Sequence, residues 1–115
     1  MSNNEYIATK DDWENYPMPE KTETFYIKKR LSKEVIAGLK RGHIPREMED
    51  KWFSYFEDNK LYIHRSWTGL CIYIVTFHTI TNRHKVIVNR DDSQYACTDK
   101  NEDIELLNTL LISLS

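Results

Sequence analysis

The sequence has no long apolar run and only three glycines, and each absence excludes a class of protein. No stretch approaches the roughly 20 apolar residues that a membrane-spanning helix needs. The N-terminal stretch MSNNEYIATKDDWENY is polar and acidic, unlike a signal peptide. The glycines are scattered, so the chain has no glycine-rich phosphate loop. We therefore expect a cytoplasmic protein with no membrane partner.

The sequence also lacks cysteine pairs at motif spacing and any strong bias of charge. Cys71 and Cys97 form no CxxC pair, and no cysteine or histidine group has the spacing of zinc ligands. We predict two reduced thiols and no metal site. The 16 basic and 18 acidic residues are mixed along the chain and leave a net charge of -2. Dedicated DNA-binding domains are usually net basic, so we expect no DNA partner.

Aromatic side chains are concentrated in residues 48–69, MEDKWFSYFEDNKLYIHRSWTG. Few structural hairpins carry so many flat rings beside so many hydrogen-bond donors, so we interpret this stretch as the functional part of the chain. The rings belong to Trp52, Phe53, Tyr55, Phe56, Tyr62 and Trp67, and the donors to His64, Arg65, Ser66 and Thr68.

The chain of 115 residues is long enough for one domain with a modest core. Residues 1–23 are polar and contain two prolines, so we predict an extended arm that Trp13 and Tyr16 dock onto the body. Residues 24–115 form the single domain. Thr24–Lys29 is interpreted as either a short strand or an extended segment.

Two helices are predicted, each with a recognisable start. Ser32 is placed as an N-cap, and Gly42 ends the first helix at about 33–41, because glycine adopts positive φ without strain. Asp99 and Glu102 have the spacing of a capping box before the second helix, at about 101–114. In both, apolar residues recur at helical spacing.

Strands are predicted between the helices, at about 51–57, 60–65, 70–78 and 84–89. The connections are short, which favours antiparallel pairing. The predicted fold class is therefore α+β, an antiparallel four-stranded meander flanked by an N-terminal and a C-terminal helix. Side chains alternate along a strand, so Cys71 and Tyr73 are expected on one face and Ile72 on the other. One face is expected to lie against the second helix and the other to keep its aromatic rings accessible.

Arg65 and Arg90 are the best candidates for binding an anion, because each ends a strand beside a polar turn. A guanidinium can donate two parallel bonds to a phosphate or carboxylate. The alternative is that each arginine pairs with a nearby acid such as Asp50 or Asp92. His64 is interpreted as a ligand-contacting or structural residue, because the sequence offers no nucleophile for it to activate. No catalytic residue is assigned.

Two stretches resemble a known family, MEDKWFSYFEDNKLYIHRSWTGLCIYIVTF and VNRDDSQYACTDKNEDIELLNTLL. Their RSWTG and VNRD-x-x-QY pieces, in that order, are similar to a small domain of uncharacterised role. That domain occurs alone or appended to bacterial ADP-ribosylglycohydrolases. The resemblance covers roughly Thr24 to the C-terminus. The acidic metal-binding motifs of the hydrolase are not among the matching pieces, so its activity is not carried over.

The resemblance implies a non-enzymatic binding module for ADP-ribose-type nucleotides, without a cofactor. One version is a viral protein in the host cytoplasm that sequesters cyclic or conjugated ADP-ribose signals of TIR-type antiphage defence. A homodimer is the default expectation. Rings would stack on adenine, and arginines, hydroxyls and turn amides would meet the pyrophosphate. The predicted ligand-binding residues are Trp52, Tyr62, His64, Arg65, Ser66, Trp67, Thr68, Asn89, Arg90 and Tyr95.

Two other functions remain open at this point. The aromatic surface could be a docking patch of a protein-interaction or toxin–antitoxin-like module. The chain could also be a small enzyme acting on ADP-ribosyl substrates, with His64 or an acid near Asp50 as base.

Overall fold

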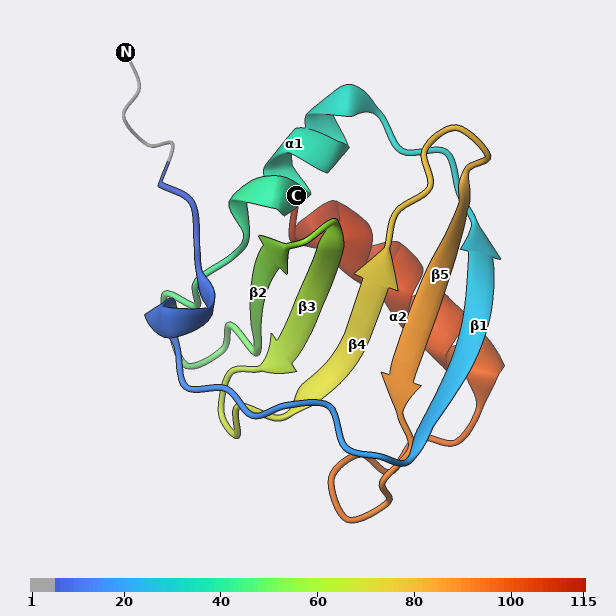
Figure 1. The fold of residues 1–115 in the computed structure, drawn as a ribbon. Coiled ribbons are helices and arrows are strands. Elements are labelled where there is room, and N and C mark those ends of the chain that lie inside the picture. Colours follow the sequence, from blue (N-terminus) through green and yellow to red (C-terminus); the bar gives the residue numbers. More distant parts are fainter. Residues whose placement is uncertain (1–5) are drawn as a thin grey trace.

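The structure is a computed structural model that describes residues 6–115 (Figure 1). Residues 1–5 of the predicted arm lie outside this range. One short 3-10 helix, five strands and two α-helices follow each other along the chain. In order they are η1 (Lys10–Asp12), β1 (Thr22–Lys28), α1 (Lys33–Arg41), β2 (Trp52–Glu57), β3 (Lys60–Arg65), β4 (Cys71–Thr76), β5 (Arg83–Asn89) and α2 (Lys100–Ser113).

The strands form one antiparallel sheet in the order β1-β5-β4-β3-β2. The predicted α+β class is confirmed, but the predicted strand number is wrong because β1 is a fifth strand. It pairs with β5 along its whole length, from Thr22 opposite Asn89 to Lys28 opposite Arg83. β1 begins two residues before the predicted start of the domain. The partner strand lies some sixty residues away in sequence, so local pattern alone did not decide between strand and extended segment.

Both helices begin at the predicted N-cap residues, although Asp99 does not form the predicted capping box with Glu102. The Ser32 hydroxyl accepts a hydrogen bond from the Val35 amide at 3.1 Å, and α1 ends at Gly42, whose φ is +77°. The Asp99 carboxylate accepts from the Asn101 amide at 2.8 Å at the start of α2. Local signals were therefore sufficient to place both helices.

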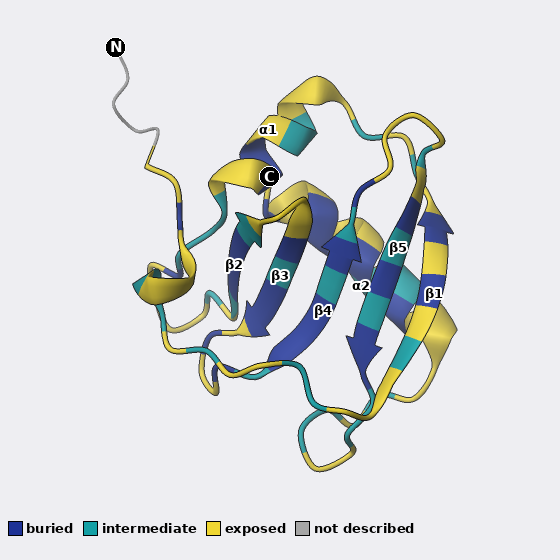
Figure 2. Cartoon of the chain, in the orientation of Figure 1, coloured by how far each residue is buried: buried dark blue, intermediate teal, exposed yellow. Residues whose placement is uncertain are grey.

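The core lies between α2 and the sheet face that α2 crosses, behind the sheet in Figure 1. Strand alternation places apolar side chains from every strand on this face. In Figure 2 buried and partly exposed residues alternate along β5, as expected for a strand with one covered face. We call the uncovered side the open face. The fully buried core residues include Leu61, Ile63, Tyr73, Val75, Val86, Val88, Leu107 and Leu111.

A bulge between β3 and β4 changes the predicted alternation. Ile63 pairs with Tyr73, but His64 pairs with Cys71, so Ile72 is bypassed. Ile72 and Tyr73 both belong to the core on the α2 side. Cys71 lies instead with His64 on the open face. The predicted grouping of Cys71 with Tyr73 is therefore wrong, because the extra residue reverses the alternation at this point.

The N-terminal segment crosses the ends of the strands on the open face before it enters β1 (Figure 1). As predicted, Trp13 docks it: the indole Nε1 donates to the Ser66 carbonyl oxygen at 2.8 Å, and the ring stacks near Phe53. The Tyr16 amide donates to the Gly69 carbonyl oxygen at 2.9 Å. We call residues 6–21 the arm. It is fixed to the β3–β4 turn by these bonds.

Within residues 6–115, no helix is long and apolar enough to cross a membrane.

Candidate functional site

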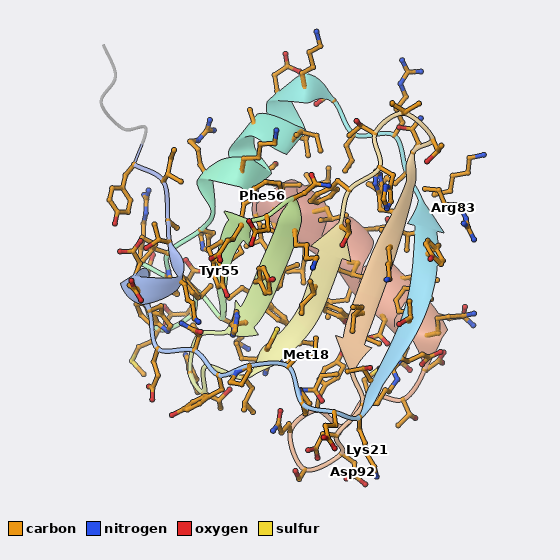
Figure 3. All side chains as sticks on the ribbon, in the orientation of Figure 1. Met18, Lys21, Tyr55, Phe56, Arg83 and Asp92 are labelled. Atoms are coloured by element: carbon orange, nitrogen blue, oxygen red, sulfur yellow. The ribbon has the colours of Figure 1, made fainter. Side chains whose placement is uncertain are left out.

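A cavity of about 340 Å³ lies between the arm and the open face of the sheet. We call it the arm cavity. Figure 3 labels two of its lining residues, Tyr55 on β2 and Met18 on the arm. The arm contributes Lys10, Asn15, Tyr16, Pro17 and Met18, and the sheet contributes Tyr55, Glu57, Tyr62, His64 and Cys71.

Two stacked tyrosines form the aromatic part of the cavity wall. Tyr55 and Tyr62 lie directly opposite each other on β2 and β3, and their ring centroids are 4.8 Å apart with the planes tilted by only 6°. Burial raises the pKa of both phenols, with nearby acidic charge adding to the effect. Both hydroxyls therefore stay protonated at neutral pH and can donate as well as accept hydrogen bonds. Tyr62 is partly exposed and offers a flat surface to a ligand.

His64 places a buried ring nitrogen without a hydrogen-bond partner among residues 6–115 in the wall of the cavity. Its side chain is almost wholly buried, with 1% of the residue surface exposed. Nδ1 lies 2.9 Å from the Gly69 carbonyl oxygen, so Nδ1 must carry the proton that it donates. Within residues 6–115, Nε2 is buried without a hydrogen-bond partner. An unpaired buried polar atom is costly, and a ligand that donates to Nε2 would remove that cost.

The protonation state of His64 is set by burial. Desolvation lowers the pKa of the imidazole, and the bond to Gly69 opposes this only in part. The ring is therefore neutral at pH 7, with a lone pair on Nε2. At this position the site therefore suits a ligand group with an N–H or O–H donor, and it does not suit an anion.

Basic side chains lie beside the arm cavity on the same face. Lys60, Thr76 and Lys85 are neighbours across β3, β4 and β5. This row is two residues along each strand from Tyr62 and its neighbours, a distance of roughly 7 Å. An anionic group on a ligand held at Tyr62 would therefore be nearest Lys60, whose partner across β2 is Glu57, and Lys85 lies two strands farther across the sheet.

The predicted site residues do not come together in one place. Tyr62 and His64 line the arm cavity. Arg65, Thr68 and Tyr95 line a second hollow of about 330 Å³. There the guanidinium of Arg65 lies 5.2 Å from the centroid of the Trp52 ring, and Trp52 itself packs against the core.

Trp67 belongs to a third surface. The residue is 68% exposed, and its Nε1 donates to the Met48 carbonyl oxygen at 2.9 Å. With Trp13, Pro45 and their neighbours it lines a shallow hollow of about 300 Å³. The indole is therefore held in place with much of its surface accessible.

Ser66, Asn89 and Arg90 are occupied by internal bonds. Ser66 Oγ donates to the Asp50 carbonyl oxygen at 2.9 Å. The Asn89 amide group donates to the carbonyl oxygen of Cys71 and to the side chain of Gln94, both at 2.9 Å. These contacts are structural and leave the two side chains no free donor toward a ligand.

Arg90 is held by two carboxylates. Its Nε lies 2.9 Å from Glu23, and its Nη2 lies 2.6 Å from Asp103. The side chain is only 13% exposed. Arg90 is therefore paired with acids, which was the alternative to an anion-binding role. Its partners are Glu23 and Asp103, which lie farther away in sequence than the predicted Asp92. Arg65 keeps an exposed guanidinium.

Sequence reasoning missed most of the arm cavity. Tyr55 could have been found, because it stands two residues from Phe53 and opposite Tyr62 in the predicted hairpin. Lys10, Asn15 and Met18 could not, because nothing local indicates that the arm crosses this face. Cys71 was grouped with Tyr73 because the bulge was not foreseen, so its place beside His64 was not predicted.

Family models, curated proteins and solved structures were compared with the chain, and none matches. The resemblance carried by the RSWTG and VNRD-x-x-QY pieces therefore stays a prediction. Among the described residues, no group of three or more histidine, cysteine, aspartate or glutamate side chains is placed to hold a metal ion.

Proposed function

We propose that this protein is a binding module for a nucleotide of the ADP-ribose type, held in the arm cavity and withheld there without turnover. The observation that carries the proposal is the buried, unpaired His64 Nε2 in the wall of an aromatic-lined cavity. Such an acceptor beside a flat ring suits a planar group that carries an N–H donor.

Adenine has these properties. Its face would lie on Tyr62, a contact worth about 1–3 kcal/mol per base. Its exocyclic amine would donate to His64 Nε2. The phosphates would extend toward Lys60 and Lys85, and the ribose hydroxyls toward Asn15 or Glu57. Support for an ADP-ribose derivative in particular comes from the resemblance described above, which would make cyclic or conjugated defence signals the biological ligands.

Calorimetric titration of ADP-ribose, cyclic ADP-ribose and AMP into the purified protein tests this directly. Binding should be weakened about tenfold or more in Tyr62→Ala, through lost stacking. Trp67→Ala, on a different surface, is the matched control and should bind as the unchanged protein does. No heat from any of these compounds with correctly folded protein would overturn the proposal.

The role of His64 can be tested on the ligand instead of the protein. An inosine analogue replaces the amine by a carbonyl oxygen, which would face the lone pair of Nε2. The carbonyl oxygen and His64 Nε2 are both acceptors, so they would repel each other and neither would gain a hydrogen bond. The inosine analogue should therefore bind much more weakly than the adenine compound. Equal affinities would place the base elsewhere.

A docking patch is the second candidate, and the exposed pair Trp67 and Met48 favours it. These side chains are 68% and 73% exposed and lie side by side. Large apolar side chains grouped at the surface often mark protein contacts. In a pull-down, loss of a partner in Trp67→Ala but not in Tyr62→Ala would support this function. Turnover of an ADP-ribosyl compound that disappears in His64→Gln would instead indicate an enzyme.

A further inference from the structure

The outer edge of β1 is an unpaired strand edge. β1 lies at one end of the strand order and pairs with β5 on one side only. In Figure 1 no strand is drawn on the outer side of β1, where only the start of α2 projects past its lower part. The strand is seven residues long and contains neither proline nor a bulge, features that usually protect such edges.

Flanking hydrogen bonds show which backbone groups of β1 point outward. The Lys21 carbonyl oxygen accepts from Arg90, and the Lys29 amide donates to Asn82, so odd-numbered residues bond toward β5. In antiparallel pairs the residues alternate between bonding toward the partner and away from it. The even-numbered residues Thr22, Thr24, Tyr26 and Lys28 therefore direct their N–H and C=O groups to the open edge. No hydrogen bond within residues 6–115 reaches those groups.

The opposite edge of the sheet, formed by β2, is partly covered by another segment of the chain. On β2, the amide and carbonyl of Ser54 both bond to His43, which forms an isolated bridge beside the strand. The protein thus covers part of one edge and leaves the β1 edge free to accept another strand.

A basic groove runs beside this free edge. It has a volume of about 380 Å³ and lies between β1 and the first turns of α2. Three cationic side chains line it, Lys28, Arg83 and Lys100, and no carboxylate does. Figure 3 shows Arg83 beside β1, and its guanidinium lies 4.0 Å from the centroid of the Tyr26 ring. Ile104 supplies an apolar contact on the α2 side of the groove.

We propose that the β1 edge binds an extended acidic segment of another protein, which adds to the sheet as a sixth strand. Its backbone would bond to Thr24, Tyr26 and their outward neighbours. Its acidic side chains would meet Lys28, Arg83 and Lys100. A second copy of this chain is a poor occupant, because residues 20–30 contain four basic and two acidic residues. Pairing β1 with itself would bring a net positive segment against a positive groove.

A fluorescently labelled peptide of seven alternating glutamates and valines is the probe. Fluorescence anisotropy should show saturable binding, and addition of the peptide should slow hydrogen exchange of the Thr24 and Tyr26 amides in NMR spectra. A peptide of alternating lysines and valines should bind about tenfold more weakly or not at all. No saturation at millimolar peptide, or equal binding of both peptides, overturns the proposal.

Two variants separate the backbone from the charges. Thr24→Pro removes an outward N–H and should abolish binding, whereas Thr24→Ala should keep it. Lys28→Glu/Lys100→Glu should weaken binding about tenfold, while Lys33→Glu/Arg41→Glu, an equal charge change on α1, should not. If Thr24→Pro does not fold, the charge variants alone decide. Concentration-dependent dimerisation that Lys28→Glu/Lys100→Glu strengthens would identify a second copy as the occupant and overturn the proposal.

Discussion

The hydroxyl of Tyr73 on β4 donates to Asp103 Oδ1 on α2 at 2.6 Å, inside the core. Asp103 is fully buried and also accepts from Tyr95 Oη at 2.9 Å and from Arg90 at 2.6 Å. The carboxylate therefore joins the sheet, α2 and the polar loop between them. Burial raises the pKa of Tyr73, and its bond to Asp103 adds to this, so the phenol remains a donor at any ordinary pH.

Tyr73→Phe should destabilise the protein by about 2 kcal/mol. The change removes a hydrogen bond to a charged group in the interior while keeping the ring, and such bonds are worth about 1.5–3 kcal/mol. Urea unfolding followed by circular dichroism measures the loss. Tyr26→Phe, on the exposed face of β1, is the control and should change stability by less than about 0.5 kcal/mol. Equal effects would mean that the buried bond contributes nothing.

Stability should fall as the pH drops below about 6.5, the ordinary pKa of histidine. Burial lowers the pKa of both His64 and His84, so the folded state binds fewer protons than the unfolded state in acid. The stabilisation from their neutral forms is complete above that pH and is lost as the pH falls toward the lowered values. Urea midpoints measured at about pH 7.5 and 5.5 should therefore differ, with the lower midpoint in acid.

The histidine variants identify the source of this pH dependence. His64→Gln should reduce the difference between the two midpoints, because one of the two titrating groups is gone. His78→Gln removes an exposed histidine whose charge makes only the smallest contribution to the lowered pKa of His84, so it should change the difference much less. An unchanged difference in His64→Gln would show that burial of this ring does not affect its protonation.

Gly69→Ala should cost about 2 kcal/mol and displace the arm. Gly69 has a φ of +76°, where a side chain is strained by about 1–3 kcal/mol. An added Cβ would lie 2.9 Å from the carbonyl oxygen of Glu14 on the arm. Hydrogen exchange of the Tyr16 amide, which donates to Gly69, should accelerate together with the loss of stability. Thr79→Ala, in an exposed turn, should do neither.

Cys97 should react with thiol reagents long before Cys71 in the folded protein. Cys71 is 1% exposed, and burial raises its pKa to about 12, so almost no thiolate is present near pH 8. Mass spectrometry after timed labelling measures each rate. Trp13→Ala removes the main anchor of the arm and should speed the labelling of Cys71, which lines the arm cavity. Rapid labelling of Cys71 in the unchanged protein would contradict a closed arm.

Local signals sufficed for the helices and for all four predicted strands, because caps, turns and alternation act over a few residues. The limits of α1 were predicted to the residue from Ser32 and Gly42. β1 stayed undecided because its stabilising partner, β5, comes much later in the chain. When a strand is stabilised by pairing with a distant partner, its own residues need not show a strong strand pattern.

The candidate site was only partly predictable for the same reason. His64 and Tyr62 stood out by residue type, and both line the arm cavity. Arg90 stood out equally, yet Glu23 and Asp103 hold it, and neither lies near it in sequence. Which ring nitrogen of His64 is free depends on the Gly69 carbonyl, a geometric fact that composition cannot supply.

The bypassed Ile72 divides β4 into two parts. Odd-numbered residues face the core in one part and the open face in the other, so the positions that tolerate substitution should differ between them. Beyond it, from Tyr73 onward, odd-numbered positions hold the interior together. Before it, the odd-numbered Cys71 faces the arm cavity, where changes would alter recognition more than folding. Deleting Ile72 would remove the bulge and restore the regular alternation of side chains between the two faces of the sheet. Cys71 would still lie opposite His64 on the open face, so the cavity wall would be kept while the interior would lose one fully buried side chain.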